Sequence, residues 1–152
     1  MRDIIQTMGL ANRDLGTILE ILAVARVKRV VDIRRYGSAG RYPQHEARFL
    51  HRELLLQGYE VCDLGALLGG DRRGGYPRYM ESAAFARGME KLEALASLGA
   101  TMLLCAEREP GRCHRRFLAE ALEERGWKVA HHVHTLAERT ARGEMRVVRK
   151  TG

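Results

Sequence analysis

The segment CAEREPGRCHRR, residues 105 to 116, combines several side-chain types that can do chemistry. It holds two thiols, Cys105 and Cys113, with two carboxylates, one histidine and four arginines. It begins at the end of the apolar run ATMLLCA, which is typical of a buried strand. Side chains of these types can bind an anion, ionise a thiol for nucleophilic attack, or hold a metal ion.

The helix after this strand is expected to begin near Arg112, which places Cys113, His114 and Arg115 in its first turn. Free N–H groups and the positive end of the helix dipole favour an anion there. The same dipole, together with the arginines, lowers the pKa of a nearby thiol. The segment therefore predicts an anion site that could also activate Cys113 or Cys105.

Three chemistries fit this segment. In the first, Arg112 and Arg115 bind a phosphate or carboxylate, and Glu107 orients an arginine or acts as a base. In the second, a cysteine is a nucleophile, with Cys105 as the first candidate, Cys113 as the other, and His114 beside them. In the third, zinc is the cofactor, although the spacing C-x7-CH matches no common zinc site.

The nucleophile hypothesis has a parallel in known sites. The strand VVDIRR, followed later by a strand that ends in cysteine, resembles the order of elements in rhodanese, and cysteine phosphatases share the anion loop. In those loops an arginine lies about five residues after the cysteine, whereas Arg108 and Arg112 lie three and seven residues after Cys105. A fourth interpretation is a non-catalytic interaction domain in which the Cys/His cluster is structural.

Strand and helix patterns alternate along the chain, which favours βαβ units. Expected strands cover 3–9, 28–34, 59–65, 100–106 and 127–134, and expected helices cover 12–25, 44–58, 81–98 and 116–126, with a long loop at 65–79 and a further strand or frayed end at 144–150. Asn12 is the expected N-cap of the first helix. The pattern predicts one domain over 1–152, a Rossmann-like three-layer α/β sandwich with a largely parallel sheet of about five strands.

Ligands of open parallel sheets bind beyond the carboxyl ends of the strands. Several residues lie near the ends of the expected strands or in the loops that follow them, which makes them candidate ligand contacts: Asp32, Arg34, Ser38, Arg41, Gly69, Gly70, Tyr79 and His131. The glycine-rich stretch at 68 to 79 contains no phosphate-loop pattern and could serve as a lid or as a surface for single-stranded nucleic acid.

Composition narrows the class of protein. The net charge is +7, and of 26 basic residues only four are lysines, which leaves 22 arginines. We therefore expect an anionic partner, a nucleotide or a nucleic acid, although compositional bias explains many solvated arginines equally well. No apolar run approaches the ~20 residues of a membrane span, so no membrane partner is expected. The three cysteines are irregularly spaced, which indicates reduced thiols and a cytoplasmic location.

The residues also carry a family resemblance, which covers most of the chain. The run from Leu103 to His132 resembles the C-terminal signature of the DUF488 family, VVDIRR resembles its VDVR strand, and SAGRYPQ resembles its S-x2-R-x-P-Q loop. The resemblance implies an α/β fold and a shared polar site, and it supplies no substrate. Leu10 and Ala11 stand where many members have histidine and serine. If that histidine takes part in a reaction, this protein is expected to have lost or altered the activity.

Overall fold

Five parallel strands form a single sheet in the order β3-β2-β4-β1-β5. The computed structural model describes residues 4–37, 42–108, 111 and 113–141. The strands are β1 (Ile4–Gly9), β2 (Arg29–Asp32), β3 (Glu60–Asp63), β4 (Thr101–Cys105) and β5 (Lys128–His132). The predicted α/β class with a parallel five-stranded sheet is confirmed.

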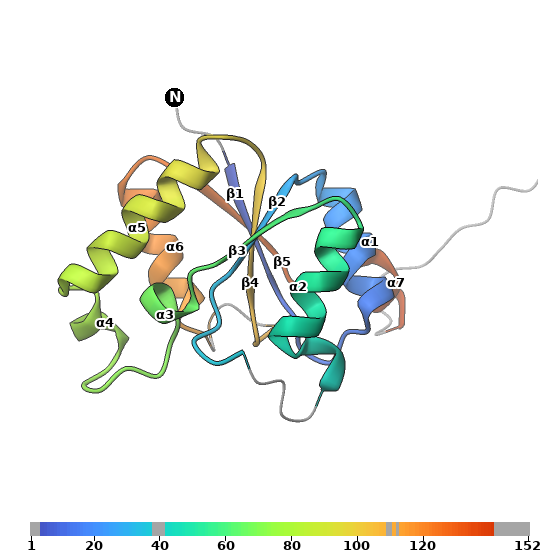
Figure 1. Ribbon diagram of the computed structural model, residues 1–152, viewed down its shortest axis with the longest axis horizontal. Coiled ribbons are helices and arrows are strands. Elements are labelled where there is room, and N and C mark those ends of the chain that lie inside the picture. Colours follow the sequence, from blue (N-terminus) through green and yellow to red (C-terminus); the bar gives the residue numbers. More distant parts are fainter. Residues whose placement is uncertain (1–3, 38–41, 109–110, 112, 142–152) are drawn as a thin grey trace, which may run out of the picture.

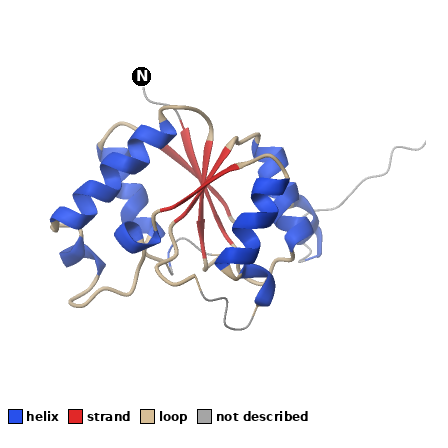
Figure 2. Cartoon of the chain, viewed as in Figure 1, coloured by secondary structure: helices blue, strands red, loops and turns tan. Residues whose placement is uncertain are grey.

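Helices cover both faces of this sheet, as Figures 1 and 2 show. One face carries α3 (Gly65–Leu68), α4 (Tyr76–Tyr79), α5 (Ala83–Ala96) and α6 (Arg115–Glu124). The other carries α1 (Leu15–Ala25), α2 (Ala47–Leu56) and α7 (Leu136–Ala141), with a short 3-10 turn, Pro43–His45, before α2. The chain is therefore a three-layer sandwich.

The core has two apolar layers because successive strand residues point to opposite faces of the sheet. Val31 and Leu103 belong to the cluster under α5 and α6, whereas Val30 and Met102 belong to the cluster under α1 and α2. All four are fully or almost fully buried. Cys105 lies in the first cluster, so its side chain faces the layer that contains α6.

The first helix begins later than expected, because Asp14 is its N-cap and not Asn12. The Asp14 side chain accepts a hydrogen bond from the Thr17 backbone N–H at 2.8 Å. The Asn12 side chain instead accepts a hydrogen bond from Arg108 Nη2 at 3.0 Å, which links the loop after β1 to the loop after β4. A tertiary contact has thus displaced the local cap.

Two further expectations on the elements were wrong. The segment 65–79 is not one long loop, because α3 and α4 occupy its two ends. Helix α6 begins at Arg115, so Cys113 and His114 precede it and do not lie in its first turn. The possible strand at 144–150 lies outside the described residues.

The carboxyl ends of β1 and β4 lie side by side at the centre of the sheet. Leu10 N–H donates to the Cys105 carbonyl at 2.7 Å, and Ala11 N–H donates to the Ala106 carbonyl at 2.8 Å. After these two strands the chain leaves towards opposite faces, to α1 from β1 and to α6 from β4. This is the kind of switch point at which α/β proteins form a ligand crevice.

Arg13 ties this edge of the sheet to α7. Its side chain is buried and donates to the carbonyls of Gly9, at 2.5 Å, and Val133, at 2.6 Å. Nη2 also contacts Glu138 Oε1 at 2.9 Å, and Arg108 Nη1 lies 2.9 Å from the same oxygen.

Among the residues that the structure describes, no helix has the length and apolar character needed to cross a membrane.

The ionisation of Glu138 is expected to stabilise the fold at neutral pH. Burial opposes it, but hydrogen bonds from Arg13, the Thr135 N–H and Arg108 outweigh burial and lower the pKa of Glu138 from 4.5 to about 2. A carboxyl group with a lowered pKa stabilises the folded state above its ordinary pKa, and this contribution is lost as the pH falls through the folded value. Glu138→Gln should therefore lower the free energy of unfolding at pH 7 and lower it less at pH 3. Urea denaturation at both pH values measures this, and an equal loss at both would contradict it.

Candidate functional site

The two thiols of the segment 105 to 116 meet at the carboxyl end of β4. Cys105 is the last residue of β4 and is fully buried, whereas Cys113 lies just before α6 and is half-buried. Their sulfur atoms are 3.3 Å apart, and both are free thiols. The third cysteine, Cys62, lies on β3, two strands away from β4 in the sheet.

The Cys113 sulfur is placed among hydrogen-bond donors. The backbone N–H of Arg115 donates to it at 3.4 Å, and His114 Nδ1 lies 3.5 Å from it. The next two amides of α6 bond to local carbonyls, Arg116 N–H to Cys113 and Phe117 N–H to His114. The group that receives the first N–H of α6 is therefore the Cys113 sulfur.

The two thiols have opposite tendencies to ionise. A hydrogen bond from the Cys105 S–H contributes most to lowering the pKa of Cys113, burial opposes it, and His114 and the Arg115 N–H add to the lowering, which leaves a pKa of about 4. The same S–H bond raises the pKa of Cys105, and burial and the negative charge of Cys113 raise it further. These opposite pKa shifts favour Cys113 as the sulfur of the pair that ionises first.

The Arg115 side chain lies in the interior of the fold. Its side chain is fully buried, and Nη2 donates to the carbonyls of Glu107, at 3.1 Å, and Arg108, at 2.7 Å. Its Nε and Nη1 atoms are buried without a hydrogen-bond partner among the described residues. Arg115 thus supports the loop after β4 from the interior, and this geometry does not support the predicted direct grip on an anion.

Loss of the Arg115 side chain is expected to destabilise the fold. Arg115→Met leaves two carbonyls of the loop without their buried donor, and one such unsatisfied group costs about 1–3 kcal/mol. The exposed neighbour provides the matched control, since Arg116→Met should change stability by less than about 0.5 kcal/mol. Urea denaturation of both variants measures the difference, and equal stabilities would contradict the supporting role of Arg115.

An open cavity of about 470 Å³ lies over Cys113. Its lining brings together five predicted site residues and four others, in chain order Arg34, Arg35, Tyr36, Gly70, Asp71, Ala106, Glu107, Cys113 and His114. Glu107 and Arg35 are exposed. Loops that follow β2, α3 and β4 supply these residues, so the carboxyl edge of the sheet forms the cavity, as the fold class predicts.

Two hollows adjoin this cavity because they share lining residues with it. One, of about 480 Å³, shares Ala106 and Glu107 and extends towards Asn12, Tyr42 and His45 at the crevice between β1 and β4. The other, of about 340 Å³, shares Asp71, Cys113 and His114 and is lined also by Tyr76, Gly111, Arg116 and Phe117. Together the three hollows form a groove that passes the Cys113 sulfur.

Arg34 lines the cavity, and the buried Asp32 holds it from behind. Arg34 Nη2 lies 2.8 Å from Asp32 Oδ2, and His51 Nε2 lies 2.8 Å from the same oxygen. Burial raises the pKa of Asp32, but the hydrogen bonds from His51 and Arg34 outweigh it and lower the pKa. Arg34 Nη1 also donates to the His45 carbonyl at 2.6 Å. Asp32 therefore fixes Arg34 in place.

Gly69 and Gly70 allow the loop after α3 to approach the cavity closely. A Cβ atom on Gly70 would lie 2.9 Å from His114 Nδ1, and one on Gly69 would lie 2.5 Å from the Cα atom of Arg35. The structure therefore places the two glycines as spacers that let His114 and Arg35 reach their positions. Gly70 also lines the cavity, whereas the Gly69 carbonyl accepts a hydrogen bond from Arg72 Nε at 2.8 Å.

The structure places two other predicted residues in packing contacts. The Tyr79 hydroxyl donates to the Leu67 carbonyl at 2.6 Å, and Arg72 stacks on its ring at 3.9 Å. His131 lies within β5, with Nδ1 2.5 Å from Thr7 Oγ1. Ser38, Arg41 and Arg112 lie outside the described residues, so their predicted contacts remain predictions.

Sequence reasoning missed Tyr36, Asp71 and His51. Tyr36 and Asp71 line the cavity, and the Tyr36 hydroxyl donates to Asp71 Oδ2 at 3.2 Å. His51 lies on the helix α2 and reaches Asp32 across the interior. A polar residue on a half-buried helix face was the available signal for His51, and no pattern in the sequence joined Tyr36 to Asp71.

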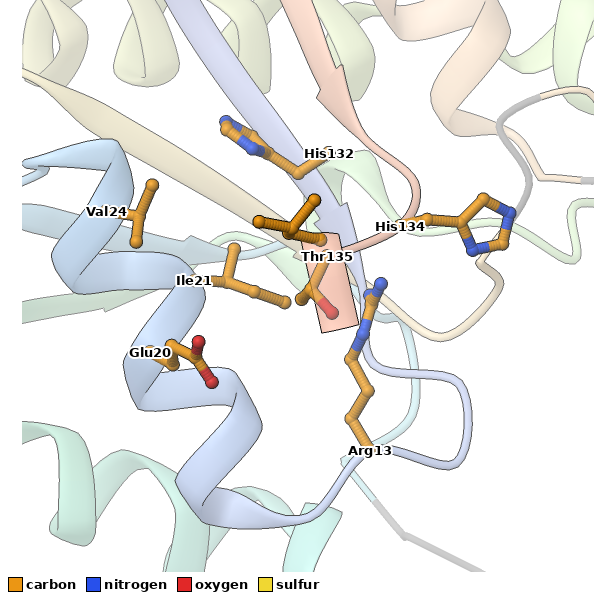
Figure 3. A pocket seen from close by; sticks show the side chains of 8 residues that line it. Arg13, Glu20, Ile21, Val24, His132, His134 and Thr135 are labelled. Atoms are coloured by element: carbon orange, nitrogen blue, oxygen red, sulfur yellow. The ribbon is translucent and has the colours of Figure 1, made fainter. Parts of the chain in front are cut away.

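The zinc interpretation remains a prediction, and a further cavity lies between α1 and α7. Within the described ranges, no group of three or more His, Cys, Asp or Glu side chains is arranged to hold a metal ion. The cavity between α1 and α7, of about 370 Å³, is separate from the thiols, and Figure 3 shows Ile21 and Val24 of α1 in its wall with His132 from the end of β5.

Comparisons with known proteins agree with the sequence motifs. No curated protein and no solved structure matches the chain. The family model described as "Domain of unknown function DUF488" matches residues 14–122, well over half of the chain. The matched range runs from the N-cap of α1 to α6 and contains Cys105, Cys113 and the cavity above them. The chain therefore belongs to the DUF488 family.

Proposed function

We propose that this DUF488 domain is a thiol-dependent enzyme in which Cys113 is the nucleophile that attacks a substrate bound in the cavity beside Arg35. The position of the Cys113 sulfur is the main support, since it borders an open cavity and is stabilised by its contacts with the Cys105 sulfur, the Arg115 N–H and His114 Nδ1. Stabilisation of this kind is what activates cysteine nucleophiles in known enzymes.

Cys113 is a better nucleophile candidate than Cys105, which the sequence had favoured. Cys105 is fully buried, and its pKa is raised, so it meets neither the requirement of access nor that of ionisation. The lowered pKa of Cys113 favours its thiolate over that of Cys105. The two sulfurs therefore divide the roles, with Cys105 as a donor to the reactive sulfur.

Two further residues supply proton transfer. His114 contacts the Cys113 sulfur and can donate to it through Nδ1. Glu107 is exposed and lines both the cavity over Cys113 and the hollow towards Tyr42, so its carboxyl group can exchange a proton with a leaving group on either side. We assign both residues to general acid–base roles.

Recognition of a phosphate-bearing ligand, a nucleotide or a nucleic acid, is the second candidate function. The alternation of exposed arginines with aromatic rings along the groove favours it, since Arg35 lies over the Tyr36 ring at 5.3 Å and Arg116 lies over the Phe117 ring at 4.4 Å. Arginines bind phosphates and aromatic rings stack on bases. The same groove could thus hold a substrate for Cys113 or a ligand that is only bound.

Site-resolved alkylation tests the first proposal. Iodoacetamide is added to the folded protein at pH 6 and pH 8, and peptide mapping by mass spectrometry gives the rate at each cysteine. We expect Cys113 to be labelled at nearly the same rate at both pH values, because it is ionised at both. Cys62→Ser is the matched control and should keep this labelling, whereas Cys113→Ser should lose it. A Cys113 rate that rises about tenfold per pH unit, as for an ordinary thiol with a pKa near 8.5, would overturn the proposal.

Protection from alkylation separates the two candidate functions. Inorganic phosphate, AMP and a short single-stranded DNA are added in turn, and we expect at least one to slow the labelling of Cys113. The double variant Arg35→Gln with Arg116→Gln should lose this protection and keep the labelling rate of the free protein. Protection without any turnover of tested electrophiles would favour recognition alone, and absence of protection by all three would remove the anionic ligand from the proposal.

A further inference from the structure

The buried Cys105 thiol lies close enough to the Cys113 sulfur to react with it as well as to share a hydrogen bond with it. We propose, resting on the role of Cys113 proposed above, that Cys105 is a resolving thiol and that the pair reduces a hydroperoxide, closing a Cys105–Cys113 disulfide. Hydroperoxides are the substrate class that this proposal assigns to the site. The peroxide first oxidises Cys113, and Cys105 then attacks the oxidised Cys113 sulfur.

The distance between the sulfurs supports this proposal. They lie 3.3 Å apart, and a disulfide bond of about 2.05 Å requires an approach of only about 1 Å. Cys105 is fixed at the end of a central strand, whereas Cys113 lies in a turn before α6 and outside any regular element. The movement can therefore occur on the Cys113 side without breaking a strand.

The chemical steps balance. The Cys113 thiolate attacks one oxygen of the hydroperoxide, the O–O bond breaks, and the other oxygen leaves as an alcohol after taking a proton from the water that enters the open cavity. Cys113 becomes a sulfenic acid. The Cys105 sulfur then attacks the Cys113 sulfur, the S–O bond breaks, and the hydroxyl leaves as water with the proton of the Cys105 thiol. The two thiols together lose two electrons when the disulfide forms, and the O–O bond of the peroxide gains these two electrons.

The local charges favour this order of events. While Cys113 is a thiolate, the hydrogen bond to it and its negative charge keep the proton on Cys105. Conversion of Cys113 to a neutral sulfenic acid removes both effects. The positive charge of Arg115 remains beside Cys105 and lowers the pKa of that thiol, and two of its buried N–H groups have no hydrogen-bond partner among the described residues. Oxidation of Cys113 thus prepares Cys105 to attack.

The shape and polarity of the cavity fit a small peroxide. It is open to solvent on the Glu107 side, and Tyr36 and Ala106 give it apolar wall beside the charged groups. Attack on an O–O bond requires a thiolate, hydrogen-bond donors near the leaving oxygen and a source of protons. It does not require a site that binds the oxygen of a carbonyl group. His114 and Arg35 are the donors that line the same cavity.

Titration with peroxide tests the proposal in a Cys62→Ser background, which removes the third thiol. One equivalent of hydrogen peroxide or cumene hydroperoxide is added, and intact mass and peptide mapping follow the products. We expect a loss of two hydrogens and a peptide pair linked through Cys105 and Cys113, and dithiothreitol should reverse both. In Cys105→Ala we expect a sulfenic acid at Cys113 that dimedone traps and no disulfide.

The outcomes separate this inference from the proposed function. A sulfenic or sulfinic acid on Cys113 with Cys105 still reduced in the protein that retains both thiols would overturn the resolving role. Rapid alkylation of Cys113 in that same protein would leave the thiolate proposal standing. Absence of both peroxide oxidation and rapid alkylation at Cys113 would overturn the two together.

Discussion

The variant Cys105→Ala is expected to have a Cys113 thiol that ionises at a clearly higher pH than in the wild-type protein. The hydrogen bond from Cys105 S–H is the largest cause that lowers the pKa of Cys113, and alanine provides no donor in its place. His114 and the Arg115 N–H remain, so the pKa of Cys113 should move only part of the way towards the ordinary thiol value of about 8.5. The pH dependence of iodoacetamide labelling at Cys113 measures this change.

A matched control isolates the contact between the two sulfurs. Cys62→Ala removes a partly buried thiol of the same core cluster that lies on another strand, so it should leave the pH dependence of Cys113 unchanged. If Cys105→Ala and the wild type give the same profile, the Cys113 sulfur does not depend on its buried neighbour. The division of roles between the two thiols would then be wrong.

Asp32→Asn is expected to cost about 3–5 kcal/mol of folding stability, because it leaves the buried Arg34 guanidinium without its counter-charge. The Asp32 and Arg34 side chains are only 2% and 7% exposed, so water cannot replace the lost partner. His51 loses the same carboxylate. Urea denaturation followed by circular dichroism measures the loss.

An ion pair whose carboxylate is exposed serves as the control for Asp32. Glu60 lies on the edge strand β3, its side chain is 64% exposed, and it pairs with the buried Arg29 on the neighbouring β2. Glu60→Gln should cost clearly less than Asp32→Asn, because water reaches the side chain at position 60. Similar losses in the two variants would show that the Asp32 carboxylate does not act as a buried counter-charge.

The strands and long helices could be predicted from the sequence because local patterns specify them. The β-branched run around Val30 and Val31 and the apolar run that ends at Cys105 each predict a buried strand, and the structure has both. Parallel order followed from the alternation with helices. The predicted gathering of polar groups at one edge also depended only on this topology, and the cavity over Cys113 lies there.

Predictions about the direction of single side chains failed where tertiary contacts decide. Arg115 was expected to bind an anion because it lies in the expected first turn of a helix, and its side chain instead points inward and donates to the carbonyls of Glu107 and Arg108. Asn12 has the right type for an N-cap, yet Arg108 binds it. Sequence periodicity contains no information about a partner nearly a hundred residues away.

The approach of Cys105 to Cys113 also could not be read from the spacing alone. The expected helix start near Arg112 would have put Cys113 inside a helical turn, whereas the helix begins at Arg115 and leaves Cys113 in the turn before it. That shift of a few residues brings the two sulfurs to 3.3 Å. The reactive character of Cys113 depends on this contact, so it emerges only from the folded structure.

Ultraviolet titration of the thiolate tests the central claim most directly. The absorbance of the folded wild-type protein is compared with that of Cys113→Ser between pH 3 and pH 10, so that the difference reports Cys113 alone. The structure predicts that the thiolate absorbance is already present at pH 6 and disappears as the pH falls through about 4, the pKa of Cys113. A difference signal that first appears above pH 8 would show an ordinary thiol and would contradict a nucleophilic Cys113.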